Sequence, residues 1–113
     1  MLATFKELPP FERLREMYLS DEAFKDLQNE LMRNPEAGDV IQDTGGLRKI
    51  RFADKRRGKG KRGGLRVIYF WKTADNQFWL FTVYDKDHAD DLTATQRKTL
   101  KKILDQEIKA RSI

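Results

Sequence analysis

The apolar residues near the start of the chain recur at helical spacing. Pro9-Pro10 suits the first turn of a helix, and the pattern that follows predicts a helix ending near Leu19. Ser20 is a good N-cap for a second helix, whose apolar stripe consists of Phe24, Leu27 and Leu31. We expect the two helices to form an antiparallel hairpin that buries these stripes against a sheet. A short edge strand is expected before them, over Leu2 to Lys6.

Three later segments are rich in apolar, β-branched and aromatic residues and are bounded by turn residues. They predict strands over 47–52, 65–72 and 77–84, with Thr73 to Asn76 as a hairpin connection. A capping box over Thr93 to Gln96 begins a last helix, with an apolar stripe of Leu100, Ile103, Leu104 and Ile108. The expected fold class is therefore α+β, with a small antiparallel sheet, an N-terminal helix hairpin and a C-terminal helix in one domain, 1–113.

Composition narrows the class of protein. The chain of 113 residues is 39% hydrophobic, which suits a single modest core. No apolar run approaches the roughly 18 to 20 residues of a membrane span, and the start lacks the apolar core of a signal peptide. We therefore expect a cytoplasmic protein without membrane contact. The absence of cysteine excludes disulfides and thiolate zinc sites.

The net charge of +5 conceals an uneven distribution. Residues 1–47 hold ten acidic and five basic side chains, whereas residues 48–66 hold ten basic and one acidic. Like charges crowded in this way repel one another unless an anion screens them, so the segment favours a polyanion or an acidic protein as partner. Its densest part is the basic loop, Lys55 to Arg62, which is expected to be too charged and glycine-rich to pack, and therefore mobile. The alternative interpretation is a solvated loop without a ligand.

Strand alternation determines which basic residues act together, because residues two apart share a face. Lys49 and Arg51 point to one face of the first long strand, and Arg48 points to the other. Arg66, on the next strand, lies close enough to share a phosphate with them if the register brings it there. Each alone would be an ordinary surface cation, but three on adjacent strands beside a basic loop favour a binding site for phosphate.

Aromatic residues crowd onto the last two strands, and bases of single-stranded RNA commonly stack on such rings. Most of these rings must form the core. Tyr84 stands at a strand end beside Asp85-Lys86, and it is the aromatic residue that we expect to reach a ligand.

Other chemistries find less support. His88 is the only histidine, so one chain cannot build a two-histidine ribonuclease site or a histidine-rich metal site. Four aspartates lead into the last helix, whose N-terminus attracts negative charge, and we expect no metal or other cofactor on Asp85, Asp87, Asp90 and Asp91. The pairs Gly45-Gly46 and Gly63-Gly64 fit neither a P-loop nor a dinucleotide fingerprint.

Three stretches of the chain resemble the HigB branch of the RelE/ParE toxins. They are 34–51, with its Gly-Asp-Val-Ile-Gln and Gly-Gly-Leu-Arg-Lys-Ile-Arg runs, 60–70, and Val83 to Lys86. The resemblance covers nearly the whole chain, and it implies a RelE-like fold. It also implies a ribosome-dependent mRNA endonuclease, or mRNA interferase, that cuts messenger RNA in the 30S decoding site without a metal and thereby inhibits translation. A cognate helix-turn-helix antitoxin would neutralise it.

The resemblance implies site residues as well. Lys49 and Arg51 fall where RelE-like nucleases carry two strand lysines, and Arg66 falls on the arginine of their Gly-x-Arg element. Lys86 falls near their later arginine. The late catalytic tyrosine of RelE corresponds to Leu92 here, so Tyr84, His88 or the ribosome would have to supply the missing group.

A mechanism follows in which the RNA 2′-hydroxyl attacks its own 3′-phosphate, while Arg51 and Arg66 spread the developing charge. Lys49 is the hypothesised general base, because neighbouring cations disfavour another positive charge. Lys86 would assist the leaving oxygen, and Tyr84 would stack on or orient a base. Contacts to ribosomal RNA are expected from Arg48, Lys55, Arg56, Arg57, Lys59, Lys61 and Arg62.

Two alternatives stay open. One is a ParE-like toxin that blocks gyrase, against which the basic strand residues argue. The other is a non-catalytic RNA-binding module that uses the same basic residues. The sequence makes no prediction about codon preference, the neutralising antitoxin element or toxin–antitoxin stoichiometry.

Overall fold

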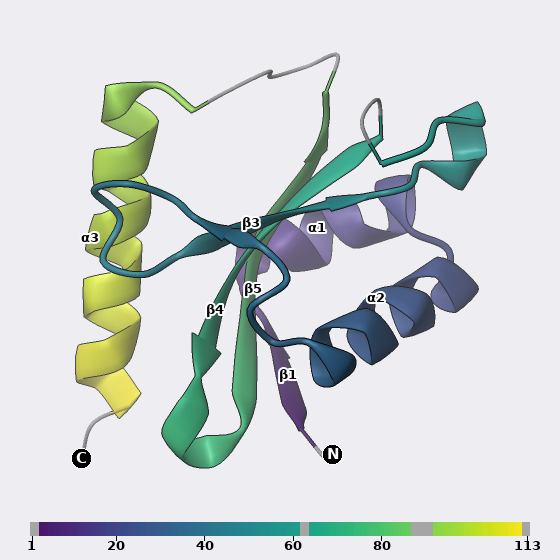
Figure 1. The fold of residues 1–113 in the computed structure, drawn as a ribbon. Coiled ribbons are helices and arrows are strands. Elements are labelled where there is room, and N and C mark those ends of the chain that lie inside the picture. The colour runs from purple at the N-terminus through teal and green to yellow at the C-terminus, as the bar shows by residue number, and fades with distance from the viewer. Residues whose placement is uncertain (1–2, 62–63, 87–91, 112–113) are drawn as a thin grey trace.

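The computed structural model describes residues 3–61, 64–86 and 92–111, and Figure 1 shows how they are arranged. Its elements in chain order are β1 (Thr4–Glu7), α1 (Pro9–Tyr18), α2 (Asp21–Arg33), β2 (Asp39–Val40), β3 (Arg48–Phe52), β4 (Leu65–Lys72), β5 (Gln77–Asp85) and α3 (Ala94–Arg111). Short 3₁₀ turns lie at Lys55–Arg57 and Thr73–Asp75. The expected α+β class, with a helix hairpin before the main strands and one helix after them, is confirmed.

The sheet has the strand order β1-β5-β4-β3-β2. The pairs among β2, β3, β4 and β5 are antiparallel, as expected. The expectation of a wholly antiparallel sheet is wrong at one edge, because β1 pairs with β5 in parallel. A parallel pair needs a long crossover connection, and the intervening helices and strands supply it. The other edge strand, β2, is not among the strands predicted from the sequence.

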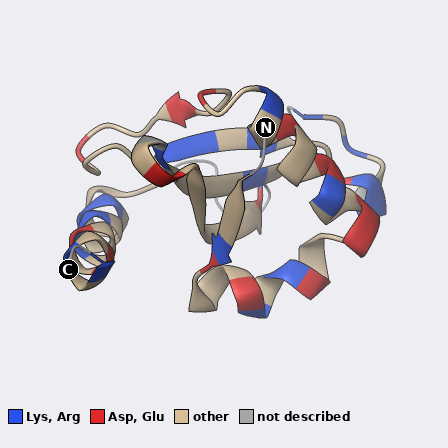
Figure 2. Ribbon diagram, turned by 90° about the horizontal axis from the view of Figure 1, so that it is seen from below, with Lys and Arg blue, Asp and Glu red and all other residues tan. Residues whose placement is uncertain are grey.

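Two apolar clusters cover opposite faces of this sheet. On one face, α1 and α2 bury Phe11, Leu27 and other residues against Ile50 and Val67. On the other face, the apolar side of α3 packs against the sheet, with Leu104 fully buried in the same cluster as Ile68, Trp79 and Phe81. Figures 1 and 2 show α3 and the helix hairpin on opposite sides of the strands. The sheet therefore presents one face toward α3 and the other toward α1 and α2.

The helix starts agree with the capping signals in the sequence. The Ala23 amide donates to Ser20 Oγ at 3.0 Å, which caps α2. At the start of α3 the capping box forms in both directions, because the Gln96 amide donates to Thr93 Oγ1 and the Thr93 amide donates to Gln96 Oε1. Local chemistry is thus sufficient to place these two ends.

Candidate nucleic-acid interface

Four of the residues proposed from the sequence lie on the face of the sheet that α3 covers. Arg51 on β3, Arg66 on β4 and Tyr84 on β5 are register partners across three strands. Lys49 is opposite Ile68, one pair further along the same face of β3. We call Lys49, Arg51, Arg66 and Tyr84 the strand cluster. The register that sequence left open thus places the two arginines side by side.

Tyr84 joins the strand cluster because of an irregularity in β5. The register between β4 and β5 shifts between Ile68 and Tyr69, so that Ile68 pairs with Thr82 and Tyr69 pairs with Leu80. Phe81 is therefore the extra residue of a β-bulge, which changes the alternation of the residues after it. Uninterrupted alternation from Phe81 would have turned Tyr84 toward the helix hairpin.

Arg66 and Arg51 differ in their surroundings. Arg66 is only 4% exposed, and its guanidinium donates to the carbonyl of Lys61 at 3.1 Å and to that of Leu65 at 3.3 Å. The bond to Lys61 ties β4 to the end of the basic loop. Arg51, by contrast, is exposed on β3. Lys86 follows β5, and its amide donates to the Gly64 carbonyl at 3.1 Å, which places Lys86 at the same end of the sheet.

Arg48 lies next to Lys49 in sequence but contacts the turn before β2. Its guanidinium donates to the Gly38 carbonyl at 2.8 Å and forms an ion pair with Glu36 at 3.2 Å. Tyr69, its register partner on β4, is fully buried, donates to the Pro35 carbonyl at 2.7 Å and accepts from the Gly38 amide at 3.0 Å. Burial raises the pKa of the Tyr69 phenol, an effect that the hydrogen bond from Gly38 only partly offsets.

The first part of the basic loop packs against the rest of the chain, so the expectation that it is too charged and glycine-rich to pack is wrong for it. Asp54 and Lys59 exchange backbone hydrogen bonds of 2.8 and 2.9 Å around the 3₁₀ turn. Asp54 is fully buried and accepts two hydrogen bonds from Arg56, at 3.0 and 2.7 Å. The Arg56 guanidinium also lies 4.8 Å from the centre of the Tyr18 ring. Arg57 belongs to the turn, whereas Arg62 lies outside the described residues.

Two lysines of the basic loop reach across to acidic residues of α2. Lys55 pairs with Asp26 at 3.4 Å, and Lys61 pairs with Glu30 at 3.3 Å. All four side chains line an open cleft of about 720 Å³ between α2 and the loop. The opposite charges of the two halves of the sequence are thus partly neutralised within the molecule. Sequence reasoning missed this because it treated the loop as unattached.

Gly64 is a further residue of the site whose role the sequence did not reveal. A Cβ added there would lie 2.6 Å from the Gly60 carbonyl oxygen and 2.8 Å from the Asp54 amide nitrogen, and it would also meet the Phe52 carbonyl oxygen. Backbone packs this closely only around a residue without a side chain. Gly64 therefore allows the basic loop to close against β3 immediately before Arg66.

An apolar groove of about 460 Å³ begins beside the strand cluster and runs between α3, the sheet and the start of α1. Its lining includes Tyr84 and Thr82 from β5, Leu92, and Thr99 and Ile103 from α3. Leu92, which the resemblance aligns with the catalytic tyrosine of RelE, is half-buried in this region. The Tyr84 ring thus stands at the boundary between the apolar groove and the basic strand residues.

The described residues contain neither a cluster that could hold a metal ion nor a helix that could cross a membrane. Within 3–61, 64–86 and 92–111, no group of three or more His, Asp or Glu side chains is arranged to hold a metal ion. Asp87, Asp90, Asp91 and His88, which the sequence analysis considered, lie outside these ranges. None of the helices in the described chain combines the length and the apolar character that a membrane crossing requires.

Comparison with known proteins agrees with this geometry. The fold is similar to that of an arginine double mutant of the Escherichia coli toxin RelE in the free state, with a TM-score of 0.54 and 14% sequence identity over 80% of this chain and 90% of that chain. A family model described as the RelE toxin of the RelE/RelB toxin–antitoxin system matches residues 4–112. The chain therefore belongs to the RelE family of toxins from toxin–antitoxin systems.

Proposed function

We propose that this toxin is a ribosome-dependent mRNA endonuclease of the HigB branch, which inhibits translation by cutting messenger RNA in the 30S decoding site. The observation that carries the proposal is the strand cluster. Arg51, Arg66 and Tyr84 are adjacent across β3, β4 and β5, and Lys49 is on the same face. A cation pair beside an aromatic ring suits a phosphate that is flanked by a base.

The residue types of the cluster support cleavage by the RNA itself. The 2′-oxygen would form a bond to the adjacent phosphorus while the bond from phosphorus to the 5′-oxygen breaks, which leaves a 2′,3′-cyclic phosphate and a 5′-hydroxyl. Lys49 would take the 2′-proton, and Lys86 would supply a proton to the leaving oxygen. Arg51 and Arg66 would stabilise the charge that develops on the phosphoryl oxygens. These cations would supply the stabilisation that other nucleases obtain from a metal.

The different surroundings of Arg66 and Arg51 favour different roles for the two side chains. Arg66 donates to the carbonyl groups of Lys61 in the basic loop and of Leu65 in β4, so it would present a fixed charge. Arg51 is exposed and would make the more adaptable contact. Arg48 faces the helix hairpin, so in this proposal it positions the turn at Gly38 and stays outside the chemistry.

The basic loop would bind ribosomal RNA around the cut site. Lys55 and Lys61 form ion pairs in which each lysine side chain remains 66% exposed, so RNA phosphates would displace Asp26 and Glu30 at little cost. The acidic residues would then position the loop without blocking it.

The cognate antitoxin is proposed, by resemblance, to be a helix-turn-helix protein in the same cytoplasm.

The proposal is tested by primer extension on a defined messenger. The messenger is incubated with purified toxin in the presence of programmed ribosomes, and as naked RNA in a control lane. Cuts that require ribosomes support the proposal. Absence of cuts together with retained binding to ribosomes would favour the non-catalytic module, and inhibition of gyrase in a DNA-supercoiling assay would favour the ParE-like alternative.

A further inference from the structure

We infer that the solvent-facing side of α3, centred on Lys98, Lys101 and Lys102, is a second binding surface for RNA phosphates, separate from the basic loop. The inference rests on the proposed function, in that the RNA is taken to belong to the ribosomal small subunit. It concerns a helix for which the sequence predicted only a role in packing.

The first half of α3 carries basic residues that do not stabilise the helix. The helix has six basic and two acidic residues, and both acidic residues, Asp105 and Glu107, lie in its second half. Its first turn contains no acidic residue. The positive end of a helix dipole favours acidic side chains, so cations near this end gain nothing from the dipole. Arg97 donates to the Leu92 carbonyl at 3.0 Å and so has a partner within the chain, whereas a ligand that carries negative charge would account for Lys98.

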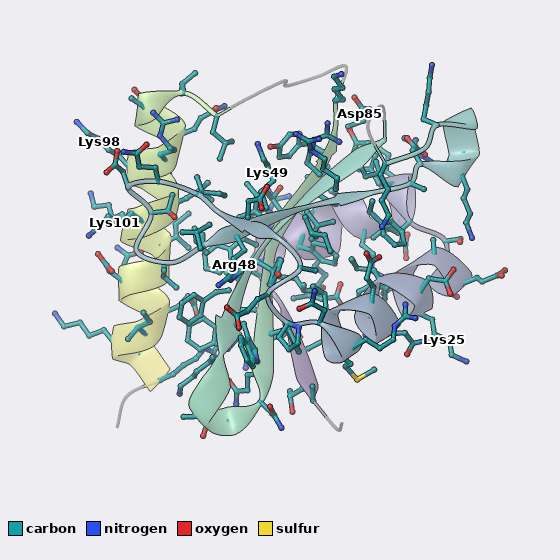
Figure 3. The ribbon with its side chains drawn as sticks, viewed as in Figure 1. Lys25, Arg48, Lys49, Asp85, Lys98 and Lys101 are labelled. Atoms are coloured by element: carbon teal, nitrogen blue, oxygen red, sulfur yellow. The ribbon has the colours of Figure 1, made fainter. Side chains whose placement is uncertain are left out.

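The lysines point away from the sheet. Leu104 is fully buried, and Leu100 and Ile103 pack beside it against the sheet. Lys98 and Lys102 are exposed on the other side of the helix, one turn apart. Figure 3 shows Lys98 and Lys101 extending outward from α3. Residues four apart on a helix have Cβ atoms about 5–6 Å from each other, so Lys98 and Lys102 form a local pair of charges.

This surface adjoins the strand cluster. A Cβ on Gly45 would lie 3.6 Å from Leu104 and 4.0 Å from the Cγ of Lys101, so the turn that leads into β3 abuts α3 at this point. Lys49 follows on β3, and Arg51 and the basic loop come after it. Basic residues therefore occur on α3, along β3 and in the basic loop, and Figure 3 labels Lys98 and Lys101 on α3 and Lys49 on β3.

The chemistry of the surface favours RNA over an acidic protein. Protein interfaces are anchored by aromatic or arginine side chains, and lysine is depleted in them. The outward side of α3 around Lys98 and Lys102 has threonine, glutamine and lysine residues but no aromatic one. Within the described chain, Lys98 and Lys102 have no ion-pair partner, whereas Lys101 pairs with Asp105 at 3.2 Å. Long solvated lysines without an apolar anchor suit phosphates, which are bound through counterion release.

The test compares two double variants that remove the same charge. The first is Lys98→Gln with Lys102→Gln, and the control is Arg13→Gln with Lys25→Gln, two exposed residues of α1 and α2 on the far side of the sheet. Filter binding measures the affinity of each protein for unprogrammed 30S subunits between 50 and 200 mM salt. Two lost phosphate contacts lower the slope of log affinity against log salt by about 1.4 to 1.8. Over that range the wild-type affinity should therefore fall about 7- to 12-fold more than that of the α3 variant.

A reduced slope in the α3 variant, with the wild-type slope in the control, is the expected result. Equal slopes in all three proteins would overturn the inference, as would a defect confined to binding of the antitoxin. Binding to 30S subunits is measured without cleavage, so failure of the nuclease proposal is a separate result. A protein that binds 30S subunits through α3 but cuts no messenger would refute the nuclease proposal and retain this surface.

Discussion

Replacement of Arg51 by alanine gives a clear test of the strand cluster, because the change leaves the fold intact. Arg51 is exposed on β3, and neighbouring Ile50 and Phe52 hold the strand in the core on the other face. Exposed substitutions away from special features change stability by at most about 0.5 kcal/mol. Loss of activity in Arg51→Ala can therefore be assigned to chemistry or binding.

The expected loss follows from the role proposed for the guanidinium. Removal of one preorganised donor from a developing oxyanion costs about 10²- to 10³-fold in rate, or about 2.7–4 kcal/mol. Arg66, the register partner of Arg51, remains in place and supplies the residual stabilisation. The remaining rate should therefore stay above that of messenger on ribosomes without toxin.

Arg48 provides the matched control, because it lies on the same strand but faces the helix hairpin. Arg48→Ala removes the hydrogen bond to Gly38 and should lower the free energy of unfolding by about 0.5–1.5 kcal/mol. Its single-turnover cleavage rate at a temperature where the variant is folded should remain near the wild-type value. Rates come from primer extension with saturating programmed ribosomes, and stability comes from thermal unfolding followed by circular dichroism. Equal losses of rate in both variants, or an Arg51→Ala rate within about threefold of wild type, would refute the assignment.

Three further predictions concern the fold and the basic loop. Tyr69→Phe should lower the free energy of unfolding by about 1–3 kcal/mol, because a buried amide loses its acceptor. Burial raises the pKa of Tyr69, so the stability that the phenol contributes is present below about pH 10 and is lost as the pH rises further. Urea titrations should therefore show the free energy of unfolding of the wild type falling at alkaline pH, and falling less in Tyr69→Phe. Gly64→Ala should destabilise the fold by about 1–3 kcal/mol or more in thermal unfolding, whereas Gly60→Ala, where a Cβ meets nothing within 4 Å, should be tolerated. Glu30→Gln releases Lys61 and should raise the affinity for 30S subunits by about two- to fivefold in filter binding; an unchanged affinity would show that the ion pair does not compete with RNA.

The sequence by itself determined most of the elements and the residues proposed for the site. Helical spacing, the Ser20 cap and the capping box at Thr93 are local signals, and the helices begin where these signals lie. Alternation within β3 also separated Lys49 and Arg51 from Arg48 correctly, because the strand contains no irregularity between those residues. Local patterns are reliable where the physical interaction that they encode is itself local.

Only the tertiary structure decided which strands meet and in what register. The bulge at Phe81 brings Tyr84 to the face of the sheet on which Arg66 lies. No short-range sequence pattern predicts this bulge, because a bulge depends on the pairing with the partner strand. The ion pairs of the basic loop with α2 join residues about thirty positions apart in the chain. The tight backbone packing that requires Gly64 likewise exists only after β3, β4 and the loop have come together. Each of these features arises from contacts between distant segments, so their energies are set by the folded arrangement and cannot be read from neighbouring residues.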